Sequence, residues 1–177
     1  MEFVLSSHQF EVWLQPKYKH ETGAMIGAEA LVRWNSSEHH VMIPPNVFIP
    51  VFERNGFIYE LDKYVWNEVC KMLRKWLDEG TCTLPISINV SRMDILQSDV
   101  YEVLTGLVEK HEIPAHLLQL EITESAFFCD VVRIIDVVER RRTYGFTMEI
   151  DDFGSAYSSV NVLKDVTADV LKLDMRF

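Results

Sequence analysis

The chain has 177 residues, of which 48% are hydrophobic and 25% charged, so it is long enough to bury one sizeable core. It contains no run of 18 apolar residues and no start typical of a signal peptide, and we therefore expect a cytoplasmic protein. The net charge of −10 disfavours binding to polymeric nucleic acid, whose phosphates attract basic proteins. An anionic ligand would need a local cation or a metal ion.

Strand-like and helix-like segments alternate along the chain, which is typical of an α/β fold with a largely parallel sheet. The first two strands are joined by a short turn that contains Gly23, and this connection predicts an antiparallel pair. Gly56 and Gly80 each follow an apolar helical pattern and are expected to end a helix. In chain order, the patterns predict strands over residues 11–19, 24–34, 85–90, 117–124, 146–150 and 168–175, and helices over 44–56, 61–80, 99–112, 130–145 and 158–166.

The sequence contains no internal repeat and no linker, so one domain is the simplest interpretation. Its last predicted strand has no covering helix after it, and a bare edge of a parallel sheet promotes association. We therefore expect either that the chain is cut short or that a second copy covers this edge in a homodimer.

Polar side chains recur within or just after five predicted strands, and in parallel α/β barrels these strand ends face the active site. Each residue alone has an ordinary explanation as a solvated carboxylate, a backbone-binding amide or a rim lysine. Together their oxygens would need a cation, and a donor set of oxygens alone suits Mg²⁺, Mn²⁺ or Ca²⁺. Adjacent aspartates can also bridge two ions. The residues are Glu29, Asn89, Glu121, Glu124, Asp151, Asp152 and Lys172.

Several segments resemble, in order and in spacing, the motifs of the EAL domain, the cyclic di-GMP phosphodiesterase family of bacterial signalling. The segments are "LQPKY", "GAEALVRW", "PPNVFIPVFERNGFI", "ISINVSRMDI", "LEITES", "DDFGSAYSS" and "VLKLDMRF". The resemblance covers about residue 8 to residue 177. It implies a modified TIM-like (β/α)8 barrel whose first strand is antiparallel to the others.

The resemblance also implies roles for individual residues. It assigns the ligands of two ions, Mg²⁺ or Mn²⁺, to Glu29, Asn89, Glu121, Asp151 and Asp152. Lys172, which would position or deprotonate the attacking water, and Glu29 are the expected catalytic residues, while Glu124 would hold the loop after the aspartates. Gln15 and Arg33 would contact the dinucleotide. Two such ions activate water and a phosphodiester, and in-line attack would open cyclic di-GMP to linear pGpG.

The chain departs from the family pattern mainly in length. Residues 1–177 are interpreted as an EAL domain that lacks strands seven and eight, and a barrel of about six strands cannot close. A phosphodiesterase is the favoured function; the alternatives are a cyclic di-GMP-binding module without catalysis and an inactive truncated fragment. A sensory or diguanylate cyclase domain is expected in the parent protein.

Glu149 is a further departure from the family pattern. It would share a strand face with Asp151, and as a buried acid it would need either Lys172 or a proton as its partner.

Overall fold

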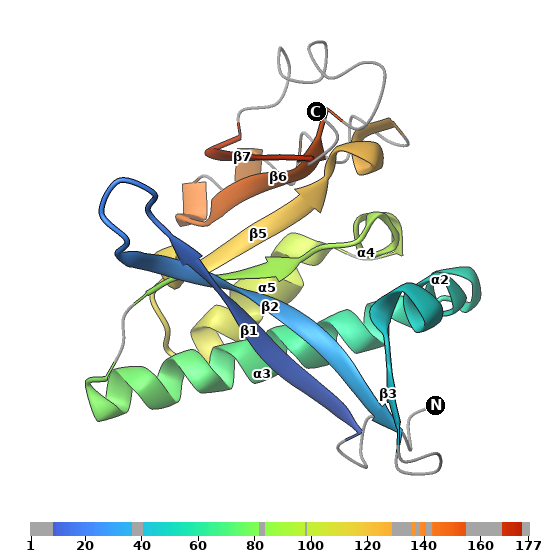
Figure 1. The fold of residues 1–177 in the computed structure, drawn as a ribbon, viewed down its shortest axis with the longest axis horizontal. Coiled ribbons are helices and arrows are strands. Elements are labelled where there is room, and N and C mark those ends of the chain that lie inside the picture. The colour runs from blue at the N-terminus through green and yellow to red at the C-terminus, as the bar shows by residue number, and fades with distance from the viewer. Residues whose placement is uncertain are drawn as a thin grey trace.

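A computed structural model describes residues 9–36, 41–81, 84–97, 99–128, 136, 139–140, 143–154 and 168–174. Within these residues the chain forms one seven-stranded sheet with the strand order β1-β2-β4-β5-β6-β7, and β3 pairs with β2 away from this path (Figure 1). The strands are β1 (Phe10–Tyr18), β2 (Met25–Ser36), β3 (Val41–Ile43), β4 (Ile86–Asn89), β5 (Leu118–Thr123), β6 (Thr147–Phe153) and β7 (Val170–Leu173).

The strand directions confirm the expected architecture. β1 and β2 are antiparallel, whereas β2, β4, β5, β6 and β7 pair in parallel. All six predicted strands are present, and β6 continues through Asp151 and Asp152 to Phe153. β3 was not predicted, because three residues are too few to show an alternating pattern.

The helices begin and end largely where the sequence predicts. Gly56 and Gly80 adopt left-handed conformations, with φ of 77° and 64°, directly after α2 and α3. The side chain of Asp99 caps α5 by accepting a hydrogen bond from the Glu102 amide at 3.3 Å. The helical elements are α2 (Pro45–Asn55), α3 (Ile58–Glu79), α4 (Arg92–Gln97), α5 (Val100–Lys110), η1 (Ala115–Leu117) and η2 (Glu124–Phe128).

Two predicted helices lie mostly or entirely outside the described residues. Most of the one predicted over 130–145, and all of the one predicted over 158–166, lie outside the described residues. Among the residues that the structure does describe, no helix combines the length and the apolar character needed to cross a bilayer.

The main apolar core lies between the sheet and the helices α3 and α5, which contact each other (Figure 1). Side chains of a strand alternate between its two faces, and the core takes one set from each of β4, β5 and β6, such as Ile88, Leu120 and Ile150. α3 contributes the fully buried Trp66 and α5 the fully buried Leu104. Because the apolar residues of these three strands point toward the helices, the intervening residues share the opposite face, and these are polar.

Candidate active site

The polar face brings together residues from strands that are far apart in sequence. Pairing of the parallel strands sets Asn89 beside Glu121 and Glu121 beside Glu149, while Glu29 on β2 lies beside Ser87 on β4. The carboxyl ends of these strands therefore meet at one edge of the sheet, as the sequence pattern predicts.

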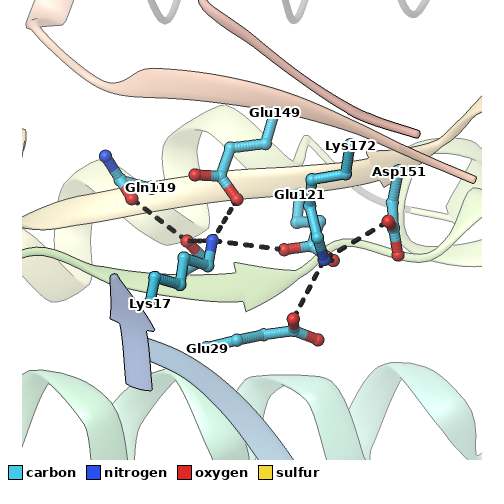
Figure 2. Close-up of polar contacts among 8 residues, drawn as sticks. Lys17, Glu29, Gln119, Glu121, Glu149, Asp151 and Lys172 are labelled. Carbon is cyan, nitrogen blue, oxygen red and sulfur yellow. Dashed lines mark hydrogen bonds and ion pairs between the residues drawn. The ribbon is translucent and has the colours of Figure 1, made fainter. Parts of the chain in front are cut away.

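Lys172 of β7 lies at the centre of three of the predicted site residues. Its Nζ donates a hydrogen bond to Glu29 Oε2 at 2.9 Å and a short one to Glu121 Oε1, and it lies 3.3 Å from Asp151 Oδ1 (Figure 2). We call Glu29, Glu121 and Asp151 the carboxylate cluster. The ammonium group of Lys172 supplies the positive charge that three converging carboxylates require.

Burial shifts the protonation of this cluster. Glu121 is 1% exposed, and this burial raises its pKa to about 8, although the hydrogen bond from Lys172 acts in the opposite direction. Burial alone would lower the pKa of Lys172, but its hydrogen bonds to Glu121 and Glu29 outweigh that effect and raise the pKa above its ordinary value. In this state Lys172 is therefore a cation and not a base.

Asn89 and Asp152 lie beside the carboxylate cluster. Asn89 ends β4 with an exposed side chain, and its carbonyl oxygen accepts a hydrogen bond from the buried Trp66 indole at 2.9 Å, which fixes the backbone at this point. Asp152 follows Asp151 in β6, and its side chain is also exposed. Its backbone is left-handed, with φ of 53°, at a point where the pairing of β6 with β7 is irregular.

The remaining predicted site residues surround the cluster. Gln15 on β1 pairs with Glu29 across the antiparallel ladder. Arg33, further along β2, donates to the Val32 carbonyl at 2.9 Å, and its guanidinium carbon lies 5.6 Å from the centre of the Trp13 ring. Glu124, at the start of η2, is fully buried and accepts a hydrogen bond from the Gly154 amide at 2.9 Å.

Lys17 of β1 is a site residue that sequence reasoning missed. Its Nζ donates to Ser87 Oγ at 2.6 Å, makes a short hydrogen bond to Glu149, and lies 3.8 Å from Glu121 Oε2 (Figure 2). The partner of Glu149 is thus Lys17 and not Lys172, which corrects the expectation. A signal was present, because Lys17 lies two residues after Gln15 and so on the same face of β1.

Two cavities adjoin Glu29. One of about 540 Å³ is lined by residues that include Glu29, Arg33, Asn89 and Arg92, and so combines acidic, amide and basic groups. The other, of about 370 Å³, lies between the edge strands β1 and β7, and Lys17 and Lys172 both line it. Glu29, a member of the carboxylate cluster, lines both cavities.

The donor set of the carboxylate cluster fits a divalent metal ion. Within the described ranges, no three acidic, histidine or cysteine side chains already form a metal-binding group. The Lys172 ammonium holds the point on which the three carboxylates converge. This ammonium is a stand-in for a cation, and the oxygens around it are of the kind that Mg²⁺ and Mn²⁺ prefer.

Comparison with known proteins places the sequence in a family. The EAL domain family matches residues 2–177. The bifunctional diguanylate cyclase/cyclic di-GMP phosphodiesterase MucR of Pseudomonas aeruginosa is 34% identical over 174 residues, which cover 98% of this chain and 25% of MucR. The cyclic di-GMP phosphodiesterase NbdA of the same organism is 32% identical, with 98% of this chain and 22% of NbdA covered. The chain thus spans a quarter or less of the length of these two relatives.

Solved structures agree with the sequence comparison. The MucR phosphodiesterase, determined as a c-di-GMP complex, superposes with a TM-score of 0.90 at 33% identity, over 98% of this chain and 70% of that one. The EAL enzyme Bd1971, in a form bound to cAMP and cyclic di-GMP, gives a TM-score of 0.88 at 29% identity, over 98% and 48% of the two chains. The family match over nearly all its residues, together with these superpositions, shows that the chain belongs to the EAL domain family.

Proposed function

We propose that this chain carries the metal-binding and phosphate-binding parts of a phosphodiesterase site that opens cyclic di-GMP to linear pGpG. The observation that carries the proposal is the convergence of Glu29, Glu121 and Asp151 on one ammonium group, beside a cavity lined by Arg33. The substrate is proposed from the relatives, because MucR and NbdA are both named as cyclic di-GMP phosphodiesterases.

Mg²⁺ or Mn²⁺ is the proposed cofactor. Glu29, Asn89, Glu121 and Asp151 are the proposed ligands of one ion, and Asp152 is the proposed ligand of a second. When bound, such ions supply Lewis-acid activation of the phosphodiester and of water. The charge of the cluster supports this assignment, because its three carboxyl groups, once ionised, exceed the single ammonium of Lys172 and leave room for further positive charge.

The other site residues would bind and orient the substrate. Arg33 would hold a phosphate through its planar guanidinium, and Gln15 would contact the dinucleotide. Lys172 keeps its proton and would act as a cation that orients the attacking water and offsets the charge of the phosphate. Glu124, through its hydrogen bond to the Gly154 amide, would fix the start of the loop that follows the two aspartates.

A second candidate is a module that binds cyclic di-GMP without cleaving it. Two observations favour it. The Lys172 ammonium already neutralises part of the carboxylate cluster, and the described sheet is open, with β1 and β7 at its edges. We also propose that a cyclase or sensory domain accompanies this one in the whole protein, as the name of MucR indicates for that relative. Dimerisation through the β7 edge stays a prediction.

Product analysis separates these candidates. The purified chain is incubated with cyclic di-GMP and Mn²⁺, and pGpG is measured by chromatography. We expect product from the unaltered chain and none from Glu29→Ala. The matched control is Glu21→Ala, which removes a carboxylate that is 77% exposed in the turn before β2 and should leave the product unchanged. Binding without product would support the second candidate, and neither binding nor product would contradict both.

A further inference from the structure

Lys17 contacts a proposed metal ligand without being a ligand itself. Its Nζ lies 3.8 Å from Oε2 of Glu121, while Lys172 holds Oε1 of the same carboxylate. Figure 2 shows Glu121 between the two lysines, with Lys17 on the side of Glu149 and Lys172 on the side of Asp151. The two oxygens of one buried carboxylate therefore face two different ammonium groups, from β1 and from β7.

Lys17 belongs to a second polar group next to the proposed ligands. Strand residues two positions apart share a face, so the residues two positions before Asn89, Glu121 and Asp151 also lie on the polar face, and ladder pairing sets one of them, Glu149, beside Glu121. These residues are Ser87, Gln119 and Glu149. The Ser87 hydroxyl donates to the Gln119 side chain at 3.1 Å and accepts from Lys17, so the group connects β1, β4, β5 and β6.

The position of Lys17 follows from the pairing of β1 with β2. Its partner across the ladder is Gly27, two residues before Glu29, which brings no side chain to this group. The lysine of β1 can therefore extend to residues of β4, β5 and β6. This reach explains why Lys17 contacts Glu149, which is 132 residues away in the sequence.

In the pair of Lys17 and Glu149 the acid is buried, the lysine is partly exposed, and the two charges compensate each other. Glu149 is 2% exposed and the Lys17 side chain is 24% exposed. A buried carboxylate is stable only with a partner, and Lys17 provides it. Because Glu149 offsets its charge, Lys17 can hold Glu121 in place while repelling an incoming divalent cation only weakly.

We propose that Lys17 is a positioning residue for the metal site: paired with Glu149, it holds Oε2 of Glu121 and keeps Oε1 directed at the point that the Lys172 ammonium now occupies. The inference rests on the proposed function, because it assigns Glu121 to a metal ion. Groups that orient a metal ligand from behind typically contribute about 10- to 100-fold to metal affinity.

The test is Mn²⁺ binding to the 177-residue chain, followed by the electron paramagnetic resonance of free Mn²⁺. The informative variant is Lys17→Met with Glu149→Met, because it removes both charges and leaves no buried ion unpaired, an exchange that is often neutral for stability. We expect Mn²⁺ affinity to fall by about tenfold with the unfolding transition close to that of the unaltered chain. The matched control is Lys19→Met with Glu21→Met, an exposed ion pair of 3.2 Å on the same hairpin, which should leave Mn²⁺ affinity unchanged.

A second variant covers the case in which the double variant does not fold. Glu149→Gln is nearly isosteric and leaves the Lys17 charge uncompensated beside Glu121, so several-fold weaker Mn²⁺ binding is expected. Wild-type affinity in a folded double variant, or in Glu149→Gln if only that variant folds, would overturn the inference and leave the proposed function standing. Absence of Mn²⁺ binding by the unaltered chain would overturn both.

Discussion

Buried carboxylates occur in two regions of this molecule and are compensated in two different ways. On the polar face of the sheet, Glu121 accepts a hydrogen bond from the Lys172 ammonium and lies 3.8 Å from the Lys17 ammonium. Between α3 and α4, burial and the charge of Asp94 raise the pKa of Asp62, and the Ser91 amide donates to Asp94 at 2.6 Å. The first region compensates its acids with cations, whereas the raised pKa values of Asp62 and Asp94 favour a bound proton in the second. We propose that these two acids share this proton, and we call them the proton-sharing pair.

The comparison shows why burial of acids does not by itself make a metal site. Burial raises the pKa of Asp62 well above its ordinary value, and the neighbouring Asp94 adds to the rise. A carboxyl pair that keeps a proton carries less negative charge, so it attracts a metal ion less strongly. In the carboxylate cluster the compensating cation is the side chain of Lys172 on an edge strand, β7, and we propose that a metal ion can take its place. Three predictions test this difference.

The largest effect is expected at Glu121. Glu121→Gln keeps the shape of the side chain but removes the charge on which the proposed ion depends, and loss of a direct ligand should weaken Mn²⁺ binding by more than about 100-fold. Asp94→Asn, which alters the proton-sharing pair, should leave Mn²⁺ affinity within about twofold, because that pair is not expected to bind metal. Equal losses of Mn²⁺ affinity in the two variants would contradict the assignment of the metal ion to the carboxylate cluster.

A smaller effect is expected from pH. Burial raises the pKa of Glu121 to about 8, so in the metal-free chain this carboxyl binds a proton more tightly than an ordinary glutamate does. A metal ion must displace that proton, so apparent Mn²⁺ affinity should rise by about tenfold per pH unit as pH approaches 8. Calorimetric titration in buffers of different ionisation enthalpy would also detect the released proton. A flat affinity between about pH 6 and about pH 8 would contradict the assignment of Glu121.

The smallest effect is expected at the proton-sharing pair, in stability alone. The pKa values of Asp62 and Asp94 are raised in the fold, so the folded chain binds these protons more tightly than the unfolded chain. The contribution of both acids to stability is therefore complete below their ordinary pKa and is lost as pH rises through the folded pKa. Asp94→Asn supplies a permanent donor to Asp62 and should gain about 1 kcal/mol relative to the unaltered chain at neutral pH and above.

Urea unfolding at about pH 5 and about pH 8 measures this gain, which should be larger at the higher pH. A matched control is Asp78→Asn, which changes an exposed carboxylate at the end of α3 and should shift stability by no more than a few tenths of a kcal/mol at either pH. A variant that is equally destabilised at both pH values would show that the pair does not share a proton.

Much of the fold could be predicted because its signals are local. Alternation of apolar residues in β4, β5 and β6 identified both the strands and the polar face, and Gly56 and Gly80 marked helix ends through their left-handed backbone. The short strand β3 and the six-residue helix α4 were missed, since neither is long enough to show a period. The helix predicted over 158–166 lies outside the described residues and stays a prediction.

The candidate site was predicted less completely, and the reason is the distance along the chain between its members. The sequence by itself determined which strand ends carry carboxylates, because alternation assigns each side chain to a face. Only the tertiary structure decided which ammonium meets which acid. Lys172 contacts Glu29 across 143 residues and Lys17 contacts Glu149 across 132, and both pairings depend on the strand order and register of the sheet. No local pattern encodes strand order, so the partner of Glu149 could be found only after the strands were placed side by side.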